Sequence, residues 1–354
     1  MGNNMAASTI SIQRPDDWHV HFRDGEMLTT VVPFTATRFA RAIVMPNLDP
    51  PITTIRSAKA YRERILMALP KNSNFIPLMT CYLTDDADID EIIEGYRTGV
   101  FSAVKFYPAG ATTNSSYGVT ELKNVFSAFE RMQEVGMPLL VHGEVTDPEV
   151  DVFDREVVYI ERVLKLIIDA FPELKIVMEH ITTKDAVDFI RARSLEAPGR
   201  IGATITAHHL MINRTDIFRG GIRPHLYCLP IAKREGHRLA LREAATSGQS
   251  PFFLGTDTAP HAKTIKESSC GCAGIFSAPT ALEMYAQVFD EENALDKLEA
   301  FASINGPIFY GLDVNQSEIK LHRTARFCPE TIETSNGEEL HVFGGGKTLV
   351  WKVL

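Results

Sequence analysis

The feature that most constrains the fold is a regular alternation of short apolar segments with longer stretches of helical periodicity. Stretches such as 121–136 (ELKNVFSAFERMQEVG) and 154–171 (DREVVYIERVLKLIIDAF) repeat apolar residues every three or four positions. The strand-like segments between such stretches are 17–22, 41–47, 75–83, 102–108, 137–143, 175–181, 201–209 and 251–257. Near-continuous apolar strands that alternate with helices indicate a parallel sheet covered on both faces. This pattern leaves a closed eight-stranded barrel or an open doubly wound sheet.

Unusual polar residues stand at the ends of six of these eight segments and separate the two architectures. They are His19, His21, Asn47, Lys105, His142, His180 and Asp257. An open sheet draws its site from a few loops, whereas a barrel collects residues from most strand ends. We therefore predict an α/β fold of the (β/α)8 TIM-barrel type, with residues 1–354 as one domain with short terminal extensions. The glycine run 343–349 (FGGGKTL) has the wrong spacing for a phosphate loop and is expected to form a turn between two terminal strands.

Composition favours a small molecule as the partner. The chain has 354 residues, is 45% apolar and carries a net charge of −9 with both signs interspersed, which argues against nucleic acid and against an anionic membrane surface. Five cysteines in so long a chain are expected to be free thiols in a reducing cytoplasm. The first ten residues lack the pattern of a signal peptide, and Ala6 stands where a myristoylation motif requires Ser or Thr.

The strand-end residues predict a metal site. His19 and His21 are two positions apart, so their side chains leave one face of a strand together. With His142, His180 and Asp257 they make too many ligands for one catalytic ion and about enough for two. Two alternatives stay open from these residues alone: the histidines could be hydrogen-bonded in the core, and Lys105 could pair with a neighbouring carboxylate.

Several long motifs resemble one family. Seven motifs are similar to those of the amidohydrolase superfamily, specifically the short, monofunctional bacterial dihydroorotases, over about Asp16 to Gly311: DWHVHFRDG, MPNLDPP, VKFYPAGATTNS, LLVHGEVTDP, EHITT, RPHLYCLP and LGTDTAPH followed by KESSCGCAG. The resemblance implies two zinc ions bridged by a carboxylated Lys105 and a nucleophilic hydroxide. It assigns one ion to His19, His21, Lys105 and Asp257, and the other to Lys105, His142 and His180. Asp257 would be the general acid and base in the reversible closure of N-carbamoyl-L-aspartate to L-dihydroorotate, in pyrimidine biosynthesis.

The resemblance also implies substrate contacts. Arg23 follows His21 by two positions and would clamp the substrate carboxylate, together with Asn47 and His261. Backbone groups near Leu229 and Ala273 would hold the ring amide. The segment 108–118 (PAGATTNSSYG) is too rich in small polar residues for a helix or strand. It would act as a lid whose Thr112 and Thr113 reach the substrate. Relatives are commonly homodimers, so a homodimer is expected.

Two other functions remain as alternatives. A hydantoinase or allantoinase would share the metal ligands but has less use for Arg23, Asn47 and His261. A catalytically inactive scaffold would be expected to have lost metal ligands, and all of them are present. His208 and His209 are expected to be structural, and a single pair, Cys270 and Cys272, is too little for a structural zinc site.

Overall fold

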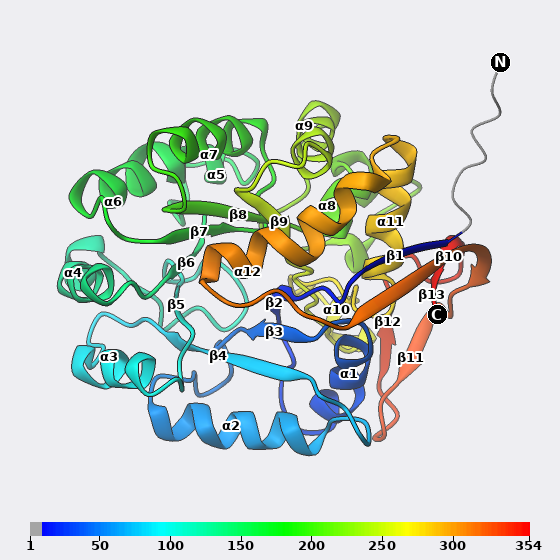
Figure 1. Cartoon of the computed structure of the whole chain (residues 1–354), viewed down its shortest axis with the longest axis horizontal. Helices are drawn as coiled ribbons and strands as arrows, with labels where there is room; N and C mark the ends of the chain where they lie inside the picture. The colour runs from blue at the N-terminus through cyan, green and yellow to red at the C-terminus, as the bar shows by residue number, and fades with distance from the viewer. Residues whose placement is uncertain (1–8) are drawn as a thin grey trace.

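The computed structural model describes residues 9–354, and the sequence-based expectations for residues 1–8 lie outside this range. Eight parallel strands form one sheet in sequence order, surrounded by helices (Figure 1). Every predicted strand segment contains one of them. The strands are β2 (Asp17–Val20), β3 (Arg41–Val44), β4 (Ile76–Tyr82), β5 (Ala103–Phe106), β6 (Leu139–His142), β7 (Ile176–Glu179), β8 (Ile201–Ile205) and β9 (Phe252–Leu254).

The sheet closes on itself where β2 meets the segment that follows β9. The N–H of Asp257 donates to the carbonyl of His19 at 2.9 Å, and the N–H of His21 donates to the carbonyl of Thr258 at 2.9 Å. Beneath this junction the buried carboxylate of Asp17 accepts hydrogen bonds from the backbone N–H of Thr256 at 2.8 Å and from its hydroxyl at 2.6 Å. The predicted (β/α)8 barrel is thus confirmed.

The helices occupy the stretches with helical periodicity. The 154–171 stretch is one continuous helical segment with a π-helical turn, η2 (Ile160–Leu164), in its middle. Several helices begin at side-chain caps that satisfy free N–H groups, among them Thr54, Asp88 and Thr183. The α-helices are α1 (Gly25–Arg38), α2 (Ile55–Met67), α3 (Ile89–Arg97), α4 (Phe126–Val135), α5 (Arg155–Tyr159), α6 (Lys165–Ala170), α7 (Lys184–Glu196), α8 (Ala207–Met211), α9 (Glu235–Thr246), α10 (Lys263–Lys266), α11 (Ala281–Glu291) and α12 (Asn305–Tyr310).

An apolar cluster inside the barrel, which we call the barrel floor, supports the site from below. It consists of Trp18, Ile43, Met45, Ala103, Leu140, Val177, Phe253 and Phe309. Trp18 stacks on Tyr310 of α12 with ring centroids 4.3 Å apart. A Cβ atom at Gly306 would lie 1.9 Å from the indole nitrogen of Trp18, so only glycine lets α12 approach this closely.

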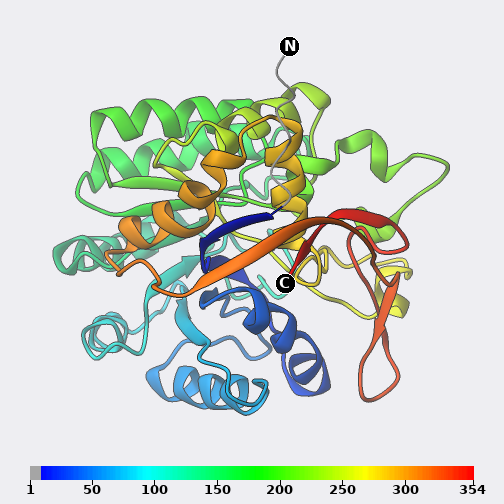
Figure 2. The ribbon, with the colours of Figure 1, turned by 45° about the vertical axis from the view of Figure 1, so that its right-hand side comes forward.

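The terminal segments add strands outside the barrel (Figure 2). An antiparallel sheet joins β1 (Thr9–Gln13), β10 (Glu318–Phe327) and β13 (Thr348–Val353), and β11 (Thr331–Glu333) pairs with β12 (Glu339–His341). The glycine run 343–349 connects β12 to β13, as predicted, although these two strands belong to different sheets. The segment 201–209 differs from its prediction, because Thr206 caps α8 and places His208 and His209 on that helix.

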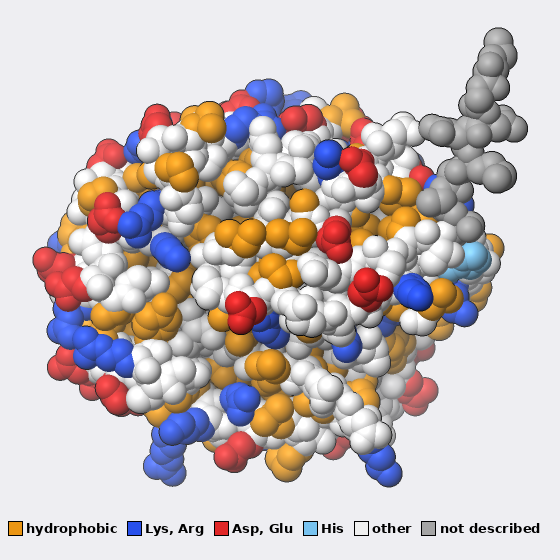
Figure 3. Space-filling model, in the orientation of Figure 1, with side chains coloured by type: hydrophobic (Ala, Val, Ile, Leu, Met, Phe, Trp, Pro, Cys, Tyr) orange, Lys and Arg blue, Asp and Glu red, His pale blue; other side chains and the backbone are white. Residues whose placement is uncertain are grey.

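The face of the molecule in Figure 3 carries acidic, basic and hydrophobic side chains interspersed, in agreement with the mixed charge pattern of the sequence. Among residues 9–354, the structure contains no helix with the length and apolarity that crossing a bilayer requires.

Candidate active site

A small pocket opens where the barrel strands end. The space between its lining residues amounts to about 320 Å³, part of which is open to solvent. All predicted site residues except Lys105 and His261 line it. The lining residues, which we call the site pocket, are His19, His21, Arg23, Asn47, Tyr107, Thr112, Thr113, His142, His180, Leu229, Asp257, Ala259, Ala273 and Gly274.

Three predicted site residues have a left-handed backbone. Arg23, His180 and Asp257 have φ values of 58°, 42° and 45°. The other non-glycine residues with positive φ in the described chain are all asparagines, which tolerate this conformation better than most residues. Such a backbone costs on the order of 1–3 kcal/mol per residue and persists where the surrounding structure enforces it. All three residues line the pocket.

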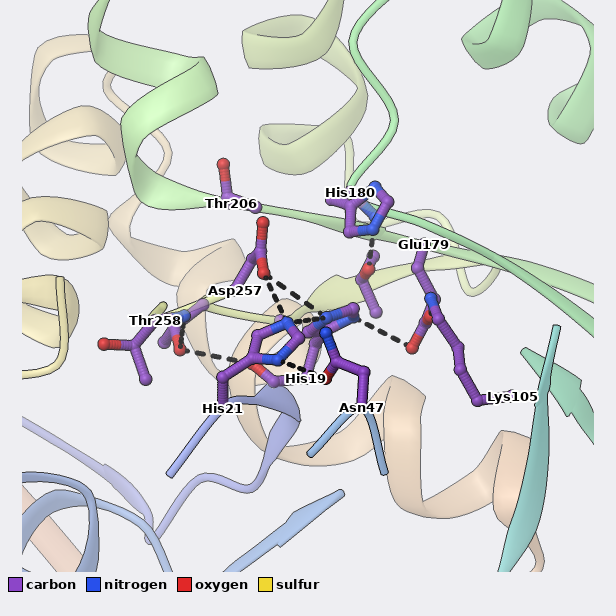
Figure 4. A network of polar contacts seen from close by, with 12 residues as sticks. His19, His21, Asn47, Lys105, Glu179, His180, Thr206, Asp257 and Thr258 are labelled. Carbon is purple, nitrogen blue, oxygen red and sulfur yellow. Dashed lines mark hydrogen bonds and ion pairs between the residues drawn. The ribbon is translucent and has the colours of Figure 1, made fainter. Parts of the chain in front are cut away.

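Three ligand atoms of His19, His21 and Asp257 form a nearly equilateral triangle (Figure 4). The two Nε2 atoms lie 3.2 Å apart, and each lies 3.3 Å from the same carboxylate oxygen of Asp257. Around a tetrahedral four-coordinate ion with metal–ligand distances of about 2.0–2.2 Å, neighbouring ligand atoms lie roughly 3.3–3.6 Å apart. The triangle therefore has the dimensions of one face of a metal coordination shell.

The protonation states of the triangle suit metal binding. Burial lowers the pKa of His21 to about 4, which leaves the imidazole neutral and its lone pair available. Burial alone would raise the pKa of Asp257, but His19, His21 and His180 outweigh this effect and hold that pKa well below its usual value. Asp257 is thus an anion and His21 a neutral imidazole, which are the forms of these side chains that bind divalent ions.

Side chains behind the histidines fix which nitrogen faces the pocket. Glu179 Oε1 lies 2.9 Å from His19 Nδ1, and Asn47 Oδ1 lies 2.8 Å from His21 Nδ1. The hydrogen bond with Asn47 assigns the proton of His21 to Nδ1 and leaves its Nε2 free to bind an ion, whereas the contact between Glu179 and His19 is close but does not have the geometry of a hydrogen bond. In His142 the other ring nitrogen is paired, because Glu144 Oε2 lies 2.8 Å from His142 Nε2 rather than from Nδ1.

A second group of potential ligand atoms lies deeper. Atoms of His19, Glu179 and His180 come within 4.8 Å of one another. His180 Nδ1 is buried, and within residues 9–354 it has no hydrogen-bond partner. Burial lowers the pKa of His180 well below its usual value, so this ring is also neutral. A buried, unpartnered nitrogen is unfavourable, and a bound cation would satisfy it.

Lys105 lies beneath the pocket and is completely buried. Its ammonium contacts the carboxylate of Glu179 and lies 4.6 Å from the ring centroid of Tyr107. The pairing with a neighbouring carboxylate, one of the alternatives left open by the sequence, is thus present. Burial nevertheless lowers the pKa of Lys105, which favours the neutral amine, the form of a lysine that reacts with CO2. The donor set of the whole site fits divalent metal ions.

Arg23 lines one side of the pocket and contacts His261, which is not itself a lining residue. Arg23 Nη2 lies 2.8 Å from His261 Nε2, and Arg23 Nε donates to the carbonyl of Pro260 at 3.0 Å. In the described chain Nη1 makes no hydrogen bond, which leaves an edge of the guanidinium for a ligand. Burial lowers the pKa of His261 to about 2, so the only cation of this pair is Arg23.

The 108–118 loop contributes Thr112 and Thr113 to the lining of the pocket. Thr113 Oγ1 donates to the carbonyl of Ala273 at 3.3 Å, and Asn47 Nδ2 donates to the carbonyl of Thr113 at 3.0 Å. Asn114 Nδ2 in turn donates to the carbonyl of Asn47 at 3.0 Å. The loop is irregular, as predicted, and these bonds bring both threonines to the pocket wall.

Three polar residues of the site were not predicted from the sequence. Glu144 and Tyr107 stand two positions after His142 and Lys105, so the two-residue repeat of a strand could have identified them. Glu179 directly precedes His180, and strict alternation would place the two side chains on opposite faces. The left-handed backbone at His180 lets both face the site.

The remaining candidates lie apart from the ligand triangle. His209 Nε2 lies 2.9 Å from the carbonyl oxygen of Pro230 and 3.5 Å from Cys228 Sγ. His209 and Cys228 thus both take part in hydrogen bonds. His208 is buried on the same helix. Cys270 and Cys272 have sulfur atoms 3.6 Å apart and form no disulfide.

Comparison of the chain with known proteins identifies its family. The model of the amidohydrolase family matches residues 12–327. A dihydroorotase of Erythrobacter litoralis is 59% identical over 345 residues, which cover 98% of this chain and 99% of that protein. The structure of a Saccharomyces cerevisiae dihydroorotase in complex with 5-fluoroorotic acid has a TM-score of 0.90 and 34% identity, covering 98% of this chain and 99% of the other. A Campylobacter jejuni dihydroorotase has a TM-score of 0.89 and 35% identity, with 99% of both chains covered. The chain therefore belongs to the amidohydrolase family and, within it, groups with the dihydroorotases.

Proposed function

We propose that the chain is a zinc-dependent dihydroorotase that reversibly closes N-carbamoyl-L-aspartate to L-dihydroorotate and water, as a step of pyrimidine biosynthesis in the cytoplasm. The observation that carries this proposal is the site pocket, where the ligand triangle of His19, His21 and Asp257 and the guanidinium of Arg23 share one small cavity. A cyclic amide with a carboxylate substituent matches both features. The expected assembly is a homodimer, with residues 1–354 of each copy acting as one catalytic domain.

Two zinc ions would be held by His19, His21, Lys105 and Asp257 and by Lys105, His142 and His180, with Lys105 carboxylated. The buried position of Lys105 between β4 and β6 supports this role, because conversion to a carbamate replaces a buried cation by an anion beside the ligands. The carbamate would carry the same sign of charge as Glu179, so Glu179 would then turn fully toward His19 Nδ1. Bound ions would polarise the ring carbonyl and lower the pKa of water to supply a nucleophile at neutral pH.

Asp257 would move the proton. In ring opening its carboxylate accepts a proton from the attacking water and transfers it to the departing amide nitrogen, and in ring closure the transfers are reversed. The hydrogen bond from the N–H of Asp257 to His19, together with its left-handed backbone, holds the carboxylate at the pocket wall. This support keeps the acid in a fixed position without help from the substrate.

The substrate carboxylate would bind to Arg23, with Asn47 and His261 beside it. Asn47 already forms hydrogen bonds with His21 and with the 108–118 loop. Its contact to the substrate carboxylate would therefore connect the bound substrate to the metal ligand His21 and to the loop. The backbone N–H groups of Leu229 and Ala273 make no hydrogen bonds within residues 9–354, and both residues line the pocket. They would therefore be free to hold the ring amide, while Thr112 and Thr113 would close the pocket from above.

The test is an ultraviolet assay that follows L-dihydroorotate, run in parallel with a neutral hydantoin and repeated after treatment with a chelator. We expect turnover of dihydroorotate, little turnover of the hydantoin, and loss of activity that added zinc restores. Preferential turnover of the hydantoin would establish a hydantoinase instead. The absence of bound metal and of activity towards both compounds would favour an inactive scaffold.

A further inference from the structure

Lys266 is a buried charge that forms no ion pair with any acidic residue among residues 9–354. It stands on the short helix α10 and is only 2% exposed, whereas most lysines of globular proteins reach solvent. Its ammonium donates to three backbone carbonyls, those of Tyr227 at 2.8 Å, Cys272 at 2.7 Å and Gly274 at 2.8 Å. A lysine has three N–H donors, so all of them are used. Nothing in the proposed reaction accounts for this arrangement.

The three carbonyls belong to the two chain segments that flank the substrate pocket. Tyr227 lies two residues before Leu229, and Cys272 and Gly274 stand on either side of Ala273. Leu229 and Ala273 both line the pocket, and their backbone N–H groups make no hydrogen bond within residues 9–354. Apart from Lys266, the N–H of Gly274, which donates to the carbonyl of Tyr227 at 3.0 Å, joins the same two segments.

The segment around Ala273 also contacts the other walls of the pocket. The carbonyl oxygen of Ala273 lies 3.0 Å from His261 Nε2, which in turn lies 2.8 Å from Arg23. The same oxygen accepts the hydroxyl of Thr113 from the 108–118 loop. A displacement of residues 272–274 would therefore move the clamp and the lid as well as the backbone that faces the substrate.

We propose that Lys266 is a positioning residue for substrate recognition, which ties the 227–229 and 272–274 segments together so that the backbone at Leu229 and Ala273 is held at the right spacing for a cyclic amide. The proposal rests on the proposed function and deepens it. Hydrogen bonds from a charged donor are stronger than neutral ones, which suits a residue that must hold three carbonyls with no other partner. Lys266 does not touch substrate itself.

The test compares Lys266→Met, Lys266→Gln and Lys266→Arg with a control, Lys263→Met. Lys263 stands on the same helix but is exposed and pairs with Glu339. The measurements are KM and kcat for dihydroorotate, the inhibition constant of 5-fluoroorotic acid, metal content and the melting temperature. Because the backbone contacts bind substrate and transition state alike, their loss raises KM more than it lowers kcat.

For Lys266→Met we expect KM and the inhibition constant to rise about tenfold or more, which corresponds to about 1.4 kcal/mol of binding free energy. We expect a smaller change in kcat, unchanged metal content and a partial return toward wild type in Lys266→Arg. Lys263→Met should match the wild type. A wild-type KM in Lys266→Met, or a fall in kcat alone, would overturn the proposal.

If Lys266→Met does not fold, the Gln and Arg variants decide, because both keep donors at this position. Wild-type KM in both would show that Lys266 only stabilises the fold. The proposed function is judged separately, from the wild-type protein. An inactive wild type would overturn that function, whereas an active wild type with unaffected Lys266 variants would overturn only the role of Lys266.

Discussion

The barrel floor and the site pocket are built from the same strands, two residues apart. On β6 the floor residue Leu140 is followed by His142, and on β7 the floor residue Val177 is followed by Glu179. Below this level the interior is apolar and its side chains need only fill space. Above it, buried polar side chains hold one another in fixed orientations. Residues that stabilise the fold and residues of the site are thus only two positions apart along a strand. We expect substitutions in the site pocket to lower turnover more than stability, and substitutions in the floor to lower stability more than turnover.

The largest effect is expected from Lys105→Ala. Removing the proposed bridge should abolish both metal binding and activity, and short carboxylic acids should partly restore activity by standing in for the carbamate. Elemental analysis and the dihydroorotate assay check this. Lys184, an exposed lysine of α7 that pairs with Asp188, offers a control substitution that should leave both properties unchanged. Electron density for an unmodified Lys105 in an active, metal-loaded protein would contradict the prediction.

Asp257→Asn keeps the shape of the side chain and removes the base. Turnover should fall by about 10²- to 10⁴-fold, the usual contribution of general acid–base catalysis, while part of the metal is retained. Steady-state kinetics together with metal analysis measure this. If turnover stayed near the wild-type value, another group would have to carry the proton.

Arg23→Met should lower the transition-state stabilisation for dihydroorotate by about 2–5 kcal/mol, as measured from the ratio of the kcat/KM values. The reason is that a buried substrate carboxylate loses its charged partner. Activity towards a neutral hydantoin should change much less. Arg64→Met is the matched control, since Arg64 is a nearby exposed arginine that pairs with Asp24 outside the pocket. An equal loss for both substrates would argue against Arg23 as the carboxylate clamp.

Replacing Thr112 and Thr113 together by valine preserves the shape of the loop and removes two hydroxyls. We expect a marked fall in kcat with unchanged metal content, because closure over the substrate excludes water and strengthens the charged contacts beneath. Ser116→Ala, an exposed change in the same loop, should have no effect. Wild-type kinetics in the double variant would reduce the loop to a simple connection.

The smallest effect on turnover is expected on the floor. Leu140→Ala should lower the free energy of unfolding by about 2–5 kcal/mol, since it leaves a cavity in a fully buried cluster. Turnover per folded molecule should stay unchanged. Chemical denaturation and kinetics on the same sample measure the two quantities. A large loss of turnover at full metal content would mean that the floor also tunes the site.

The sequence predicted the barrel because its eight strands are short, apolar and separated by helical periodicity. The strand-end residues were recognisable for the same reason, since a histidine or lysine that ends an apolar run is conspicuous. Glu179 was not, because it directly precedes the expected ligand His180 and strict alternation would place the two side chains on opposite faces, whereas the left-handed backbone at His180 lets both face the site. Lys266 begins the motif KESSCGCAG, but no role was predicted for it, because its three carbonyl partners come together only in the folded chain. The sheet of β1, β10 and β13 was expected only as terminal extensions, because its strands pair across the whole length of the chain.

The closure of the barrel has a consequence for the synthesis of the protein on the ribosome. His19 and His21 emerge early from the ribosome, whereas Asp257, whose backbone bonds to His19, emerges after all the other proposed ligands. The nascent chain can therefore present individual imidazoles for most of its synthesis but cannot assemble the ligand triangle until the ring has closed. A chain truncated before residue 257 would lack both the seam of the barrel and the acid at its site. Tight metal uptake should thus report completion of the ring, and it should appear late in translation.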